Sequence, residues 1–479
     1  MCHYFRAVRM PFGHACGALL ATFCISATVT AASASAVTLK DQLRLVLRDN
    51  PQIAKARDDV GAAREGENIA DAPFLPDVTL SGDGGYENTD SPATRRSGRG
   101  DFSTSRYTQS LTVTQNLFDG RASTQGRRQA QFSTRIAEQT LRSTIQSVVL
   151  EGATAYLNVL RQSELVKLAR GNERTIRIQL ELEDERVQRG SGIAVDVLLA
   201  KSRLQLAKER RVAFETGLRD AVSRYTQTFG QAPDVADLTP PQSPRYLLPP
   251  DLGGAISMVQ EENPAIRASG FEVDLADAQR SSARSGFFPR IDLIGEQNWE
   301  KDFDGTRGIE RNYSVIVQFN WDLFSGFATQ AGVAQAAKQY SAARGNARFV
   351  ERKAIEQLEL SWHAYESTEE RRELLRNAVN IAGEVFDSRK RLRDSGKETA
   401  INVLDAENEL LNACINFVNA DFDNQISVFQ VLFSLGRLDP EALGIAEDVT
   451  GTSPVAADAP ELTGAGDALA AAGCRIENG

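Results

Sequence analysis

The chain has 479 residues, of which 42% are hydrophobic and 25% charged, and its formal net charge is −10 at pH 7. An acidic chain lacks the basic face that nucleic-acid binding needs, so we expect no nucleic-acid partner. Three histidines and five cysteines leave little for a metal centre or a disulfide framework, and we expect no metal and no other cofactor.

The first 36 residues have the layout of a secretory signal peptide, with a basic start, a short apolar run and small-x-small sites ending at Ala36. Phe23 is too bulky to precede a lipoprotein processing site at Cys24, so we predict no lipid anchor. The rest of the chain has no run of about 18 apolar residues. Export without a spanning helix leaves a soluble extracytoplasmic protein or an outer-membrane barrel.

The remaining chain contains an internal duplication. Matching positions lie 213 residues apart at first and 206 residues apart from residue 117 onward: Asn50-Pro51 with Asn263-Pro264, Pro76 with Pro289, Gly120 with Gly326, and Gly190 with Gly396. We therefore assign a first repeat to residues 37–235, a Pro-rich linker to 236–250 and a second repeat to 251–445. The Ala/Gly/Asp-rich composition of residues 446–479 is typical of a disordered tail.

Each repeat is expected to read helix, strand, strand, long helix, helix. Period-two alternation predicts strands at about 77–88, 105–117, 290–301 and 311–322. Their length suits tilted membrane strands, and aromatic residues lie near their ends, where a membrane protein places its aromatic belt. Soluble sandwiches also alternate, so the strands alone leave a soluble protein open.

The predicted long helices are free of proline from Arg121 to Arg189 and from Phe327 to Ser395. Each run could span on the order of 100 Å at 1.5 Å per residue. Apolar residues three and four apart, such as Leu411, Cys414 and Val418, form seams that pack in coiled-coil fashion. A soluble helical rod would have the same seams, but it would have no use for the four strands.

Four strands cannot close a membrane sheet, and an open edge in lipid leaves backbone groups unpaired at several kcal/mol each. Two chains would supply eight strands and a filled lumen, whereas three would supply twelve and an aqueous bore. The predicted inward face is small and polar, which favours water and hence three chains. Other closures remain open from the sequence alone.

From Val37 to Ile445 the chain resembles the TolC family of outer-membrane channel proteins. The resemblance rests on the doubled Asn-Pro start, the Phe-x-Pro junctions, the strand-to-helix corners and the segments that follow Gly190 and Gly396. Six residues of these motifs are expected at structural turns: Pro76, Gly120, Gly190, Pro289, Gly326 and Gly396.

The resemblance implies a mainly α fold with a transmembrane β-barrel part and an internally duplicated helix-strand-strand-helix-helix order. It implies a homotrimer with a twelve-stranded barrel, in contact with outer-membrane lipid and continued by a long α-helical tunnel in the periplasm. Such proteins are exit ducts that dock an inner-membrane transporter through a periplasmic adaptor, and they catalyse no reaction.

The resemblance also places a periplasmic gate on Asp196, Arg393, Glu398, Asn402 and Asp405. Family acids at two of these positions ring the constriction and favour cations; because one of them is the amide Asn402 here, a single ring from Asp405 is expected. Asp196 is expected to form a latch with Arg393, which leaves Glu398 to find another cation. Alternatively, Asp196 caps its helix and Asp405 lies on a solvated face.

We predict the outer-membrane exit duct of a type I protein secretion system. One alternative is the outer-membrane component of a tripartite multidrug efflux pump, but many efflux members carry a lipidated N-terminal cysteine. A second alternative is a soluble periplasmic coiled-coil scaffold, which the paired strands disfavour. No nucleophile elbow, phosphate loop or pair of metal ligands supports an enzyme.

Overall fold

The computed structural model describes residues 37–445 except 97, 99–101 and 191, so the predicted signal peptide (1–36) and tail (446–479) lie outside the described residues. The first half contains α1 (Leu39–Asp49), α2 (Pro51–Asp71), η1 (Ala72–Phe74), β1 (Asp77–Thr89), α3 (Pro92–Arg96), β2 (Phe102–Phe118), α4 (Ala122–Gln188) and α5 (Ala194–Phe229). The second contains η2 (Arg245–Leu247), α6 (Leu252–Glu262), α7 (Pro264–Ala283), η3 (Arg284–Phe287), β3 (Arg290–Lys301), β4 (Ile309–Asn320), α8 (Ala328–Asp394) and α9 (Ala400–Leu435).

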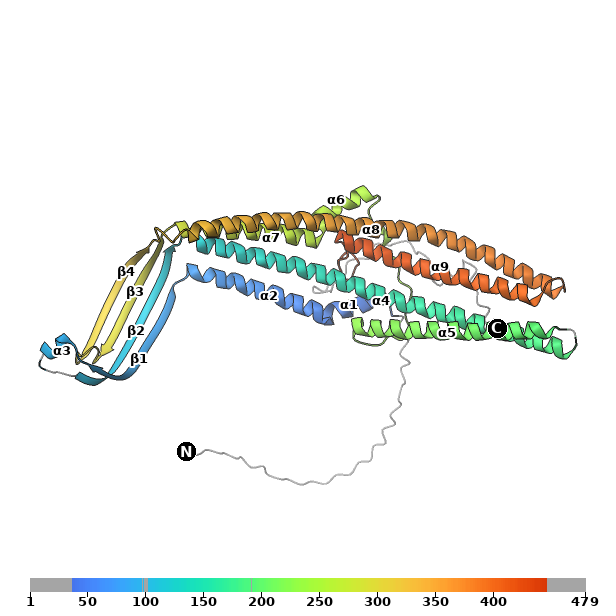
Figure 1. The fold of residues 1–479 in the computed structure, drawn as a ribbon, viewed down its shortest axis with the longest axis horizontal. Helices are drawn as coiled ribbons and strands as arrows, with labels where there is room; N and C mark the ends of the chain where they lie inside the picture. The colour runs from blue at the N-terminus through green and yellow to red at the C-terminus, as the bar shows by residue number, and fades with distance from the viewer. Residues whose placement is uncertain (1–36, 97, 99–101, 191, 446–479) are drawn as a thin grey trace, which may run out of the picture. The chain divides into compact units, whose positions relative to one another are not determined.

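The two halves repeat one another, apart from α3 and η2, which have no counterpart in the other half (Figure 1). The long helices α4 and α8 have 67 residues each, and α5 and α9 have 36 each. In each half the long helix follows directly from a strand and turns back into the shorter one. Among the described residues, no helix combines the length and the apolar character needed to cross a membrane.

The Asn-Pro pair begins the second helix of each half. The Asn50 side chain accepts a hydrogen bond from the Gln52 amide at 2.8 Å, and the Asn263 side chain accepts one from the Ala265 amide at 2.9 Å. Each asparagine is thus the N-cap, and the proline after it occupies the first helical position, where no amide proton is needed. The doubled motif therefore marks equivalent bends, between α1 and α2 and between α6 and α7.

The four strands form one antiparallel sheet in the order β1-β2-β3-β4, which leaves β1 and β4 at its edges. One face carries an apolar row that crosses all four strands and consists of Val78, Val113, Gly295 and Val315. The other face carries polar rows, such as Thr79, Thr112, Glu296 and Ser314. Val315 is 78% exposed, so no described part of the chain covers the apolar face there.

The strand ends differ slightly from those expected. β2 starts at Phe102, because its pairing continues to Thr89 of β1. β4 runs from Ile309 to Asn320, two residues earlier than expected, because its register is set by Arg290 opposite Asn320. Trp321 lies just past the strand, and its indole N–H donates to the Phe287 carbonyl at 3.2 Å.

The corner at Gly120 requires glycine. Its φ is +67°, and an added Cβ would lie 2.9 Å from the Ser285 carbonyl oxygen and 2.8 Å from Phe288 Cβ. The corner between β2 and α4 therefore packs tightly on the junction of the second half between η3 and β3. The equivalent corner glycine, Gly326, has φ +61° but no neighbour within 4 Å of an added Cβ.

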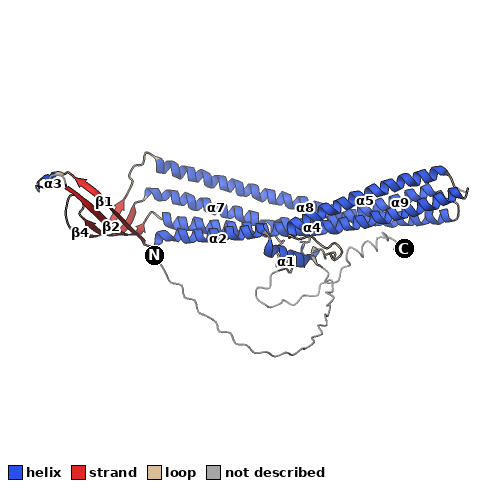
Figure 2. Cartoon of the chain, turned by 90° about the horizontal axis from the view of Figure 1, so that it is seen from below, coloured by secondary structure: helices blue, strands red, loops and turns tan. Residues whose placement is uncertain are grey.

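The helices pack side by side, and Figure 2 shows α2, α4, α7 and α8 extending from the strand end of the chain. The main apolar core lies where α9 packs against α4, α8 and the short helix α6, and the other short helix, α1, joins this core through α4. Its largest fully buried side chains include Tyr156, Tyr225, Phe417 and Phe422. A second, small cluster, called here the tip cluster, joins α4, α5 and α9: Ile176, Ala200, Leu204, Ala207 and Leu404.

Candidate functional site

The candidate gate residues lie around the two turns that join α4 to α5 and α8 to α9. Gly190 and Gly396 have φ values of +79° and +74°, in the left-handed region that glycine occupies without strain. Their amides donate to the Val187 and Arg393 carbonyls at 3.0 and 2.8 Å. Each long helix therefore ends in the same way and reverses within a few residues.

Arg393 on α8 forms an ion pair with Glu183 on α4. Their side chains are only 9% and 5% exposed, so the pair is withdrawn from water. Arg186 approaches the same carboxylate at 3.5 Å. A buried pair of this kind holds two helices in register, because sliding one helix along the other would leave a buried charge without its partner.

The expected latch between Asp196 and Arg393 is not formed: within the described part of the chain, the ion pair of Arg393 is with Glu183. Asp196 lies in the first turn of α5 and is half-buried. A carboxylate there is stabilised by the positive end of the helix dipole. Asp196 is not the helix cap, because the N-cap of α5 is Ile193 and no side chain makes a capping hydrogen bond there.

Glu398 and Asn402 contact each other. The Asn402 amide donates to the Glu398 carboxylate at 2.5 Å, and the backbone amide of Thr399 donates to it at 3.0 Å. These hydrogen bonds, from Asn402 above all, hold the pKa of Glu398 below its ordinary value. Within the described chain, Glu398 thus makes local contacts just before α9, and the positive charge of Arg389 also acts on it.

Asp405 on α9 forms an ion pair with Arg203 on α5 at 2.6 Å. The Asp405 side chain is 52% exposed, so one side of the carboxylate still faces water. The pair ties α9 to α5, whereas the Arg393 pair ties α8 to α4. Two ion pairs thus cross between the helices of the first half and those of the second.

Sequence reasoning missed Glu183 and Arg203. Glu183 lies seven residues after the buried Ile176, which places a carboxylate on the apolar seam of α4. A charged residue at a seam position is a readable signal that a buried partner exists. The sequence contains no comparable signal for Arg203, which is half-buried at the side of α5.

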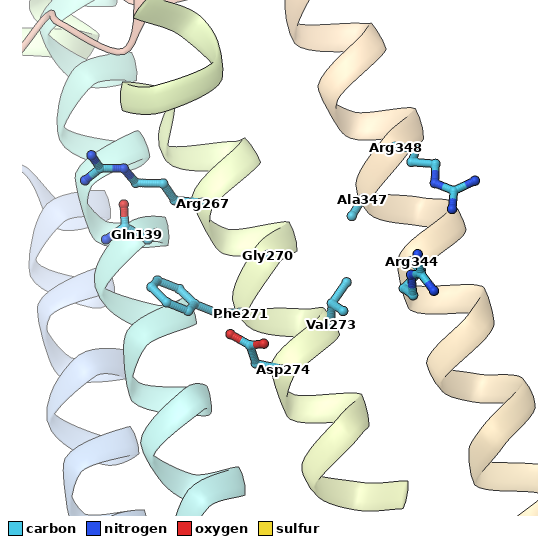
Figure 3. Close-up of a pocket in the computed structure, with 9 residues that line it drawn as sticks. All are labelled: Gln139, Arg267, Gly270, Phe271, Val273, Asp274, Arg344, Ala347 and Arg348. Atoms are coloured by element: carbon cyan, nitrogen blue, oxygen red, sulfur yellow. The ribbon is translucent and has the colours of Figure 1, made fainter.

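The described residues contain no group of three or more histidine, cysteine or acidic side chains that could hold a metal ion. A cavity of about 620 Å³ lies between α4, α7 and α8, and Figure 3 shows its lining. Arg267 extends from α7 toward Gln139 of α4, whereas Arg348 extends from α8 away from α7. The guanidinium groups do not converge on a common point, so the cavity offers no assembled anion site.

Comparison with known families decides the class of protein. The family model described as "Outer membrane efflux protein" matches residues 43–231 and 255–437, one segment in each repeat. The chain belongs to this family. Outer membrane efflux proteins are channel proteins without enzymatic activity, and they lie in the outer membrane with their helices in the periplasm. The predictions of family, location and non-enzymatic character are confirmed.

Individual members of this family are similar to this chain along most of their length. The alkaline protease secretion protein AprF of Pseudomonas aeruginosa is 25% identical over 88% of this chain and 89% of its own. The efflux protein BepC of Brucella suis is 25% identical over 88% of this chain and 90% of its own. The solved outer membrane protein VceC of Vibrio cholerae has a TM-score of 0.72 at 17% identity and covers 83% of this chain and 96% of its own. The predicted fold class is that of these outer-membrane channels.

Proposed function

We propose that three copies of this chain form the outer-membrane exit duct of a type I protein secretion system. Each copy supplies four strands to a closed barrel and its long helices to a periplasmic tunnel. The duct accepts cargo from an inner-membrane transporter through a periplasmic adaptor and releases it outside the cell. It moves cargo passively and catalyses no step.

The observation that carries this proposal is the open sheet. β1 and β4 each have one edge without a partner strand among the described residues. Their apolar side chains are exposed, with Leu80 at 64%, Val315 at 78% and Val317 at 64%. In lipid, unpaired backbone groups cost several kcal/mol each, so the edges must be paired. A second copy offers the matching edge, because β1 of one chain can continue β4 of another.

The duplication indicates how the copies meet. Within one chain, the Gly120 corner packs on Ser285 and Phe288 of the second half. At the 213-residue offset those residues correspond to Ala72 and Leu75, and at the 206-residue offset Gly326 corresponds to Gly120. The Gly326 corner has open space around it, and Leu75 is 66% exposed. The segment containing Leu75 of a neighbouring copy can therefore pack on the Gly326 corner, as Phe288 packs on the Gly120 corner within one chain. Repeating this contact from copy to copy closes a ring.

A row of exposed apolar residues on α8 supports lateral contact between the helices of different copies. The row has the spacing of a coiled-coil seam and comprises Leu374, Ile381, Val385 and Leu392. Each of these side chains is at least 38% exposed. Burying the row against a neighbouring copy would extend the pairing from the sheet into the tunnel.

The crossing ion pairs support a closed resting tip. Glu183 with Arg393 and Arg203 with Asp405 join the helix pair of one repeat to that of the other. Opening the tunnel requires the two helix pairs to separate, and an adaptor that binds the open form more tightly would supply that energy. Asp405 keeps a solvated side, which suits a ring of three carboxylates at the constriction.

Replacing Asp405 with alanine is expected to weaken the block of ion current by multivalent cations in planar bilayers, because the ring loses its charge. Arg203→Ala is expected to strengthen that block, since it frees the carboxylate that Arg203 now pairs. Asp234→Ala, which removes an exposed carboxylate outside the helix turns, serves as the control, with no change in block expected. Unchanged block in both variants would remove Asp405 from the ion path.

The relatives include proteins named for secretion and for efflux. AprF is named for secretion and BepC for efflux, and each is 25% identical to this chain. The similarity to AprF and to the proteases secretion protein PrtF of Dickeya chrysanthemi favours secretion. Efflux is the second candidate, favoured by the description of the family.

Deleting the gene tests the proposal. We expect an exported protein to disappear from the culture medium, as measured by mass spectrometry of the supernatant, while drug susceptibility stays unchanged. Restoring the gene on a plasmid should restore export. Hypersensitivity to several drugs with an unaltered supernatant would establish efflux instead.

A further inference from the structure

Glu407 is a buried carboxyl group at the contact between α9 and α4. The residue is 7% exposed. One carboxylate oxygen accepts a hydrogen bond from the Asn172 amide at 3.0 Å, and the other accepts one from the Gln179 amide at 3.2 Å. Both amides come from α4, so this one side chain bridges two helices that belong to different repeats.

No cation forms an ion pair with Glu407 among the described residues. The nearby charged groups on α4 have other partners, since Glu173 pairs with Arg177 and Arg211, and Glu183 pairs with Arg393. On α5, Arg203 pairs with Asp405. From α8, Lys390 acts on Glu407 only through its charge. The negative charge of Glu407 is therefore stabilised by two neutral amides rather than by a counter-ion.

The surroundings of Glu407 are otherwise apolar. Leu404, one turn earlier on α9, belongs to the tip cluster, and Ile176 of that cluster lies between Asn172 and Gln179 on α4. Ala200, Leu204 and Ala207 bring α5 into the same cluster. A charge here costs desolvation energy for as long as the helices stay packed, and water would relieve that cost once they separate.

We propose that Glu407 is a proton-sensitive joint between α9 and α4, so that protonation keeps the tip packed and ionisation loosens it. The inference rests on the proposed duct function, because it assigns a regulation to the gate of that duct. Its ligand is the proton, and the moving parts are the helix pairs α4–α5 and α8–α9.

The direction of the pH effect follows from the linkage between proton binding by Glu407 and packing of α9 on α4. Burial raises the pKa of Glu407 to about 7, against an ordinary value of 4.5. The packed form therefore holds the proton more tightly than the separated form. Packing is most stable below about pH 4.5, loses stability as the pH rises toward 7, and changes little above that. The equilibrium constant for opening is expected to rise by up to about tenfold per pH unit in this window.

Resting conductance of the purified protein in planar bilayers, measured from pH 5 to pH 8, tests the joint. The wild type is expected to conduct more as the pH rises, and Glu407→Gln is expected to stay at the low conductance at every pH. Glu409→Gln is the matched control, because Glu409 is exposed on the same helix and should leave the wild-type profile unchanged.

A second variant separates titration from a loss of packing. Asn172→Ala removes one of the two donors that stabilise the ionised form, so the midpoint of the conductance change should move to higher pH. A wild type that conducts equally from pH 5 to pH 8, or a Glu407→Gln variant that keeps the wild-type profile, would overturn the joint but not the duct. A protein that conducts no ions at any pH would overturn both.

Discussion

Replacing Val315 with arginine is expected to abolish assembly of the protein in the outer membrane. Val315 lies in the middle of β4 on the apolar face and is 78% exposed. An arginine on the lipid face near the bilayer centre costs about 2–4 kcal/mol, and each copy in the ring would bear that cost. The measurement is the amount of oligomer in detergent-extracted outer membranes, resolved on native gels.

The neighbouring residue provides the control. Ser314 lies opposite Glu296 on the polar face of the same strand. Ser314→Arg should assemble normally, because its side chain faces water in the bore. Normal assembly of Val315→Arg, or equal failure of the two variants, would contradict the assignment of the apolar face to lipid.

Replacing Arg393 with serine is expected to raise the resting conductance of the closed channel strongly. The change leaves Glu183, 5% exposed, without its buried partner. Removing one member of a buried ion pair typically costs about 3–5 kcal/mol, which would shift a closed tip toward open forms by two orders of magnitude or more. Single-channel recording in the absence of the adaptor protein measures this rise in resting conductance.

Two further variants identify the partner of Arg393. Glu183→Gln should raise conductance in the same way, and the charge exchange Glu183→Arg with Arg393→Glu should restore much of the closure. Asp196→Asn should leave the closed state intact, since no ion pair joins Asp196 to Arg393 in the described chain. Opening by Asp196→Asn with no effect of Glu183→Gln would reinstate the latch first suggested by the sequence.

The architecture was largely readable from the sequence, because it rests on local and periodic signals. Asn50 and Asn263 each cap a helix that begins with proline, and this chemistry needs only neighbouring residues. Strand alternation gives the apolar face directly, since side chains alternate with period two. The repeat offset of 206 residues relates the two long helices, which have the same length.

The partners at the helix turns were not readable in the same way. Arg393 and Glu183 are 210 residues apart, and their contact depends on the rotational phase of two 67-residue helices. A family motif supplies the positions but not that phase, so it could not indicate that Arg393 pairs with Glu183 within one chain. The contact between Glu398 and Asn402 is local, because Glu398 lies just before Thr399, the N-cap of α9, and Asn402 lies in the first turn of that helix.

Disulfide formation between β1 of one copy and β4 of another tests most directly whether identical chains close the barrel. Ser81 corresponds to Ile294 at the 213-residue offset, and Asn320 corresponds to Thr114 at the 206-residue offset. Thr114 and Ile294 are paired within one chain, so Asn320 should lie opposite Ser81 of a second copy.

The double variant Ser81→Cys with Asn320→Cys is therefore expected, after oxidation in the membrane, to run as covalent dimers and trimers on non-reducing gels. Single variants, and Ser81→Cys with Ser314→Cys, should not form this ladder, because Ser314 lies six residues or about 20 Å along the strand from Asn320. The account predicts a ladder that ends at three chains; a double variant that remains monomeric would contradict it.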